Sequence, residues 1–202
     1  MGENVGIARS LNAALREARA PVVAVQDADD WSERERLERQ LAVLDAEPDV
    51  AVVGSRMREV DESGRELTPR TSFAPGDVGG VLMRFNPIPN TSAVLRRDVV
   101  LDLGGYDPRY RYATEYDLWL RVAEQRRVVA LDETLSTRRM SSTNVAARAE
   151  RAQTAEAIAI RLRALRRRRT LRGASGLGLP VMSFLTPLSL KRARRRRLGQ
   201  GA

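Results

Sequence analysis

The sequence predicts an α/β fold, an open sheet of mixed strand direction flanked by helices and followed by a basic helical tail. Helical and strand-like apolar patterns alternate early in the chain, which favours parallel pairing. Later strand-like runs follow one another more closely, which favours antiparallel pairing. Apolar residues make up 43% of the 202 residues, enough for one core of ordinary size plus an appendage.

Each element follows from a local pattern. Apolar side chains recur at helical spacing before Pro21, which ends the first helix. The β-formers after it predict a buried, parallel strand. Ser32 and Glu35 have the spacing of a capping box that opens the next helix, and Gly104-Gly105 ends a short helix further on. The expected elements are helix 5–19, strand 22–26, helix 32–47, strand 48–55, strand 91–97, helix 98–103, helix 113–125, one or two strands over 127–140, and helix 146–172.

The chain contains no cysteine and no histidine. Disulfides, the usual zinc sites and acid/base catalysis by histidine are therefore excluded. A bound metal ion would have oxygen ligands, which favours Mg²⁺, Mn²⁺ or Ca²⁺. A general base would be a carboxylate, a tyrosine or Lys191, the only lysine.

The net charge of +9 is unevenly distributed. Residues 148–202 carry 15 Lys/Arg and two Glu, a net charge of +13, whereas residues 1–147 have a net charge of −4. We therefore expect a domain at 1–147 and an Arg-rich helical tail at 148–202. Basic runs flank an apolar segment in the tail, so it either lies on an anionic membrane surface or is a solvated basic segment. Nucleic-acid binding is the weaker alternative, because the chain has no recognised reader motif.

A cluster of carboxylates ends the first predicted strand, in the stretch "VVAVQDADDW" at 22–31. Asp27 and Asp29 are two residues apart, and Asp30 follows directly. In open α/β sheets, ligands bind beyond the carboxyl ends of strands. The carboxylates either form an oxygen-lined seat for a divalent cation on a diphosphate, or belong to an acidic loop that caps the next helix.

Several stretches together resemble the family 2 glycosyltransferases, which have the fold called GT-A. They follow the family's order and spacing over residues 3–145, and they are "NVGIARSLN" with "VVAVQDADDW", "NPIPNTSAVLRRDVVLDLGGYDPRY" and "TEYDLWLRV". The resemblance implies a Rossmann-like GT-A sheet. It also implies transfer of a sugar from a nucleotide-sugar donor to the hydroxyl of a glycan or lipid-linked acceptor, with inversion and a divalent cation, Mn²⁺ or Mg²⁺. Such a protein would act in polysaccharide biosynthesis, in the cytoplasm or at the inner face of the membrane.

The resemblance also implies roles for single residues. Asp27 and Asp29 match the family's D-x-D, whose carboxylates contact the donor ribose and hold the metal on the diphosphate, with Asp30 adjoining. The general base lies at the start of "TEYDLWLR", where Glu115 and Asp117 are the two candidates. We favour Glu115, because it matches the second of two acids that the family usually has there. Asp117 is four residues before Arg121, an ion-pair spacing.

Four further residues are weaker candidates. Arg9 either reaches a donor phosphate or is an exposed helix arginine. Asn86 and Asn90 belong to "NPIPNTS", which resembles the family's acceptor-side loop. Trp119 falls four residues after Glu115, so it either walls the acceptor side or packs in the core.

The sequence departs from the family in two places. The strands that usually precede "NVGIARSLN" and build the pocket for the nucleotide base are absent, so we expect a new edge strand and possible loss of activity. Such a chain would be a fragment, the product of a misplaced start, or a scaffold at the membrane surface that retains the fold without catalysis. Many members also have a histidine after the base helix, where this chain has Arg138, Arg139 and Met140.

Overall fold

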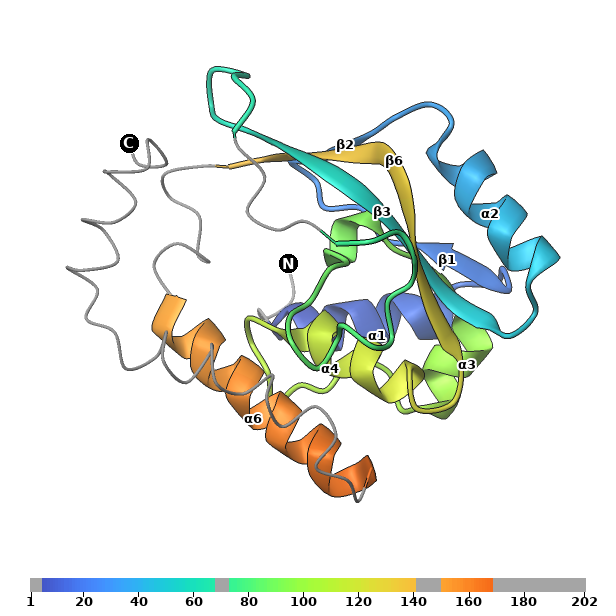
Figure 1. The fold of residues 1–202 in the computed structure, drawn as a ribbon, viewed down its shortest axis with the longest axis vertical. Helices are drawn as coiled ribbons and strands as arrows, with labels where there is room; N and C mark the ends of the chain where they lie inside the picture. Colours follow the sequence, from blue (N-terminus) through green and yellow to red (C-terminus); the bar gives the residue numbers. More distant parts are fainter. Residues whose placement is uncertain (1–4, 68–72, 141–149, 169–202) are drawn as a thin grey trace.

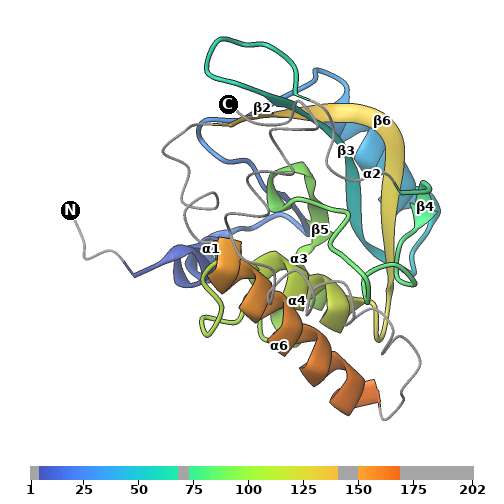
Figure 2. The same cartoon turned by 60° about the vertical axis from the view of Figure 1, so that its left-hand side comes forward.

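A computed structural model describes residues 5–67, 73–140 and 150–168. One mixed sheet has α2 on one face and α1, α3 and α4 on the other, with α6 lying along α4 (Figures 1 and 2). The elements are α1 (Ile7–Glu17), β1 (Val22–Ala24), β2 (Trp31–Ser32), α2 (Arg36–Ala46), β3 (Val50–Val60), β4 (Gly76–Asp77), the 3₁₀ helix η1 (Asn90–Ser92), β5 (Val94–Arg96), α3 (Arg97–Asp102), α4 (Thr114–Val122), β6 (Arg127–Arg139) and α6 (Glu150–Arg168).

The strand order is β1-β5-β3-β6-β2, and β4 pairs separately with β6. Only β3 and β6 pair in parallel, and their long ladder contains register shifts. The predicted segment 127–140 therefore forms one strand, β6, with irregularities rather than two. The other pairs of the described strands are antiparallel. This mixed sheet confirms the predicted fold class.

β3 contributes side chains to two cores. Ala51 and Val52 belong to the large core that α1, α3, α4 and α6 share, whereas Val50 and Val53 belong to a smaller core under α2. A register shift between Val50 and Val52 interrupts the regular alternation of faces here, and the strand is apolar on both sides. The central position of β3 follows from that pattern.

Two predictions about the first strand and its helix are wrong in detail. β1 is half-buried and antiparallel to β5, not buried and parallel, because β5 runs back beside it and no other described strand pairs with it. The capping box does not form, because Ser32 pairs with Ser136 in the sheet and its hydroxyl bonds Gln26. Helix α2 begins at Arg36 without a side-chain cap.

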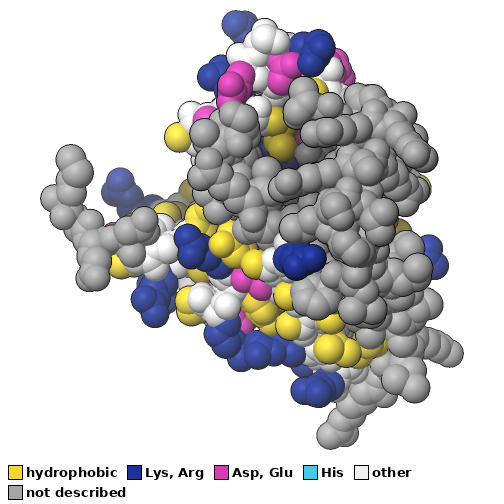
Figure 3. Space-filling view, turned by 90° about the vertical axis from the view of Figure 1, so that its left-hand side faces the viewer, with side chains coloured by type: hydrophobic (Ala, Val, Ile, Leu, Met, Phe, Trp, Pro, Cys, Tyr) yellow, Lys and Arg dark blue, Asp and Glu magenta, His cyan; other side chains and the backbone are white. Residues whose placement is uncertain are grey.

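Helix α6 shares the large core. Ile160 and Ala164 are fully buried, and Leu165 is nearly so. The described part of segment 148–202 therefore packs with residues 5–140, whereas the apolar and basic segment that suggested membrane association lies outside the described residues. No helix in the described part is both long and apolar enough to cross a membrane. On the face in Figure 3, basic side chains gather near the lower end with few acidic ones among them.

Candidate active site

The carboxylate cluster lies in a turn that two other segments hold in place. The backbone N–H of Asp27 donates to the Thr91 hydroxyl at 3.1 Å, and the Asp30 N–H donates to the Asp27 carbonyl at 3.2 Å. Arg36 on α2 is buried and donates to the carbonyl of Val25 at 2.8 Å. The end of β1 is thus fixed from η1 on one side and from α2 on the other.

The carboxylates of this turn lie close together, and the pKa values of two of them are raised. Burial raises the pKa of Asp27, and the nearby Asp29 raises it further, while Arg138 acts against both. Burial also raises the pKa of Asp30. Its Oδ1 accepts the Arg139 N–H at 3.2 Å, whereas its buried Oδ2 has no hydrogen-bond partner among the described residues. A cation or a set of donors would relieve this repulsion.

Glu115 lies in the first turn of α4 and faces the same site. The Asn86 side-chain amide donates to its Oε1 at 3.1 Å. Burial raises the pKa of Glu115 to about 7, and Asp27 contributes in the same direction, while its own N–H, Arg138 and Asn86 oppose the shift. Since Asp27 and Arg138 both act on Glu115, the structure brings the two candidate sites together.

Tyr106 lies near both Glu115 and Asp27, since each of these carboxylates adds to the rise that burial causes in its pKa. No sequence pattern had indicated this residue. Its hydroxyl donates to Asn90 Oδ1 at 2.9 Å, and burial, Glu115 and Asp27 all raise its pKa. Asn12 fixes its backbone through two hydrogen bonds of 2.7 Å. The available signal was an aromatic residue placed directly after Gly104-Gly105.

Arg138 on β6 acts on both carboxylates, because its positive charge lowers the pKa of Asp27 and of Glu115. It forms an ion pair with Glu59 on β3, while its buried Nε has no hydrogen-bond partner among the described residues. The guanidinium is thus partly anchored and retains donor capacity.

Asp117 and Trp119 point elsewhere. Asp117 is buried and paired with Arg121 at 2.7 Å, and Arg121 also donates to the carbonyls of Leu103 and Gly105. Trp119 has no exposed surface, and its Nε1 donates to the Ile88 carbonyl at 3.0 Å. Asp117 holds Arg121, which ties α4 to the turn after α3, and Trp119 bonds the loop between Asn86 and Asn90 through the Ile88 carbonyl.

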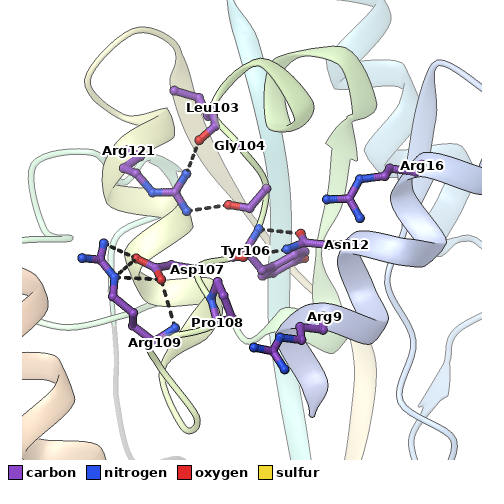
Figure 4. Close-up of a pocket in the computed structure, with 11 residues that line it drawn as sticks. Arg9, Asn12, Arg16, Leu103, Gly104, Tyr106, Asp107, Pro108, Arg109 and Arg121 are labelled. Atoms are coloured by element: carbon purple, nitrogen blue, oxygen red, sulfur yellow. Dashed lines mark hydrogen bonds and ion pairs between the residues drawn. The ribbon is translucent and has the colours of Figure 1, made fainter. Parts of the chain in front are cut away.

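Arg9 lines a pocket whose lining residues include neither the Asp27–Asp30 turn nor Glu115 (Figure 4). The pocket has a volume of about 630 Å³, and it lies between α1 and residues 103–109. Arg9 and Arg16 approach it from α1 and make no ion pair with a described residue, whereas Arg109 is paired with Asp107. Arg9 makes no hydrogen bond to the Asp27–Asp30 turn among the described residues.

Comparison with known proteins identifies the family. Residues 1–104, just over half of the chain, match the family model described as glycosyl transferase family 2. The chain belongs to glycosyl transferase family 2. It is 33% identical over 120 residues to the amylovoran biosynthesis glycosyltransferase AmsE of Erwinia amylovora, and 33% identical over 124 residues to the putative glycosyltransferase EpsE of Bacillus subtilis. These matches cover 59% and 60% of the chain, but 45% and 44% of the relatives, so the chain spans just under half their length.

Solved structures share the GT-A fold. S. aureus TarS in complex with UDP-GlcNAc superposes with a TM-score of 0.56 at 16% identity, covering 77% of this chain and 46% of TarS. The mannosyltransferase PcManGT of Pyrobaculum calidifontis, solved with GDP-Man and Mn²⁺, gives a TM-score of 0.54 at 19% identity, covering 96% of this chain and 59% of PcManGT. At these identities the likeness concerns the fold alone.

The carboxylates of this site are compatible with a divalent cation that takes some of its ligands from the protein and the others from a bound substrate. Within the described ranges, no group of three or more acidic side chains could hold a metal ion alone. Asp27 and Asp29 would offer hard oxygen ligands, and their mutual repulsion falls when a cation is bound. The remaining ligands would be diphosphate oxygens and water.

Proposed function

We propose that the chain carries the catalytic part of a glycosyltransferase that moves a sugar from a nucleoside-diphosphate donor to an acceptor hydroxyl with inversion. The observation that carries this proposal is the raised pKa of Glu115, to about 7, in a site that it shares with Asp27. A carboxylate with a pKa near neutrality both accepts a proton and exists as the base at physiological pH.

The chemical step is a single displacement. The acceptor oxygen forms a bond to the anomeric carbon as the bond from that carbon to the diphosphate oxygen breaks. Glu115 takes the hydroxyl proton, and the diphosphate leaves with the bonding electrons. Attack from the face opposite the leaving group inverts the anomeric centre, so one base is sufficient.

Two groups of residues would hold the donor diphosphate. Asp27 and Asp29 would bind Mn²⁺ or Mg²⁺, which neutralises charge on the leaving diphosphate when bound. The guanidinium of Arg138 would offer further positive charge, because its buried Nε has no partner among the described residues. Arg9 makes no hydrogen bond to the Asp27–Asp30 turn among the described residues, so we assign it a secondary role.

The acceptor would enter over the loop that carries Asn86 and Asn90. Asn86 contacts Glu115 directly, and Asn90 contacts Tyr106, so both amides line the proton-accepting side of the site. Their remaining donors and acceptors are suited to sugar hydroxyls.

Donor binding is tested by titrating the chain with UDP and GDP, with and without Mn²⁺, in a calorimeter. We expect Mn²⁺ to tighten binding of one nucleotide, and Asp29→Asn to remove that effect, because the cation loses an oxygen ligand. Asp102→Asn, which changes an exposed carboxylate on α3, is the matched control. Equal Mn²⁺-dependent binding in Asp29→Asn contradicts the assigned seat.

Transfer is tested with the sugar donors of the nucleotide that binds, by following nucleoside diphosphate release with glycan acceptors. The rate should rise with pH through about 7, as Glu115 loses its proton. Glu115→Gln should lower turnover by about 100-fold or more and leave donor binding unchanged. Turnover that survives this substitution would show that another group is the base.

A further inference from the structure

Helix α6 contacts the segment just before α4 through one carboxylate. Glu156 Oε1 accepts the N–H of Arg111 at 2.9 Å, and its Oε2 accepts the N–H groups of Tyr112 at 2.8 Å and Ala113 at 3.1 Å. Hydrogen bonds from backbone N–H groups to a carboxylate are stronger than those between neutral groups. Three such bonds on one side chain fix the path of the chain as it enters α4.

The N-cap residue of α4 is Ala113, and its side chain caps no N–H group. The first hydrogen bond of the helix, from the Asp117 N–H to the Ala113 carbonyl, is long at 3.3 Å. The first N–H groups of a helix need outside partners. Glu156 bonds the three N–H groups that precede the helix, and Glu115 follows two residues later.

A second contact from α6 reaches the other side of Glu115. Arg161 is buried, and its Nε donates to the Tyr116 hydroxyl at 2.7 Å while its Nη2 donates to the Arg84 carbonyl at 2.5 Å. Tyr116 adjoins Glu115, and Arg84 is two residues before Asn86. The two partners of the 3.1 Å hydrogen bond, Asn86 and Glu115, are therefore each attached to the same helix.

We propose that Glu156 is a positioning residue, which holds the first turn of α4 so that the Glu115 carboxylate stays against the Asn86 amide. Its significance for catalysis rests on the proposed function, in which Glu115 is the base. The positional claim itself does not, because it concerns the contact between Glu115 and Asn86. Without Glu156, residues 111–113 lose three hydrogen bonds and the first turn of α4 gains freedom.

The test compares Glu156→Ala, Glu156→Gln and a control by nuclear magnetic resonance on the full chain. The control is Glu124→Gln, which weakens the contact of α6 with the other end of α4 through Arg167. One signal is the Asn86 side-chain amide, which reports its bond to Glu115. The second is exchange of the Asp117 amide hydrogen, and the third is the pH titration of the Glu115 carboxyl, whose charged neighbours are Asp27 and Arg138.

We expect Glu156→Ala to shift the Asn86 amide signals and speed exchange at Asp117 by about tenfold or more, since three N–H groups before the helix lose a charged acceptor. The Glu115 pKa should fall toward its ordinary value, because a looser turn is better solvated. Glu156→Gln retains one acceptor oxygen and should give smaller changes in the same direction. Glu124→Gln should leave all three signals unchanged.

Unchanged Asn86, Asp117 and Glu115 signals in folded Glu156→Ala overturn the inference. Equal changes in Glu124→Gln also overturn it, because they would mean a general loosening of α6. If Glu156→Ala does not fold, the same criteria apply to Glu156→Gln. Failure of sugar transfer in the wild-type chain would sink the proposed function and leave these three measurements interpretable.

Discussion

Burial of Glu115 reduces folding stability at neutral pH and at the same time gives its carboxyl a pKa suited to accepting a proton. Burial raises its pKa to about 7, so the folded protein holds this proton at pH values where the unfolded chain, near 4.5, has released it. Folding stability from this group is therefore greatest at low pH and is lost as pH rises from about 4.5 through 7. A carboxyl that weakens the fold at neutral pH is typical of a functional site.

Arg138 opposes the rise that burial causes in the pKa of Glu115. Its guanidinium lowers the pKa of both Glu115 and Asp27, so Arg138→Gln should raise both values. The transfer rate would then rise at a higher pH than in the wild type, and the Glu115 carboxyl would titrate later in a ¹³C experiment. Arg39→Gln, at an exposed position on α2, is the control. A Glu115 pKa that falls or stays constant in Arg138→Gln would contradict the assigned electrostatics.

Among the elements, the turn from α3 to Tyr106 depends most on one residue type. Gly104 and Gly105 have φ values of +83° and +72°, which disfavour any side chain. A Cβ on Gly104 would meet nothing within 4 Å, whereas a Cβ on Gly105 would lie 2.3 Å from Asn12 Oδ1. The same Asn12 side chain fixes the Tyr106 backbone, so the second glycine makes room for the support of the site.

These neighbouring glycines form a matched pair of test positions. Gly104→Ala should reduce the free energy of unfolding by about 1–2 kcal/mol, through backbone strain alone. Gly105→Ala should reduce the free energy of unfolding by about 1 kcal/mol more than Gly104→Ala, because Asn12 must move and its two hydrogen bonds to Tyr106 weaken. Urea denaturation measures both. Equal losses would mean that Asn12 adapts without effect on Tyr106.

Local patterns predicted the parts of the site that lie within one element. The strand β1, which ends three residues before Asp27, and the start of α4 just before Glu115 both follow from local sequence patterns. The antiparallel partner of β1, the short strand β2 and the role of Tyr106 depend on contacts between distant segments, which no local pattern records. Asn12 and Tyr106, for example, are 94 residues apart in sequence.

At the scale of the whole molecule, the Arg-rich composition of α6 gave no indication that this helix packs in the large core. Four of its six arginines contact the body of the protein. Arg161 and Arg163 bond Tyr116 and Tyr110, and Arg167 and Arg168 both pair with Glu124. Guanidinium groups form such bonds while their apolar stems cover the neighbouring helix. Charge composition predicted an Arg-rich helical tail at 148–202, and within it the described helix α6 contributes Ile160, Ala164 and Leu165 to the large core.

A chain that ends at residue 147 tests this integration, with a chain that ends at residue 170 as the matched control. The shorter chain lacks Ile160, Ala164 and Leu165, and Tyr116 and Ala113 would lose their cover from α6. Burial of such side chains contributes on the order of 5 kcal/mol in total, comparable with the stability of a whole domain. We therefore expect the shorter chain to melt at a much lower temperature and to bind a hydrophobic dye, while the longer chain melts as the full chain does. Equal melting temperatures for the two would mean that residues 1–147 fold independently and that α6 only docks on a finished core.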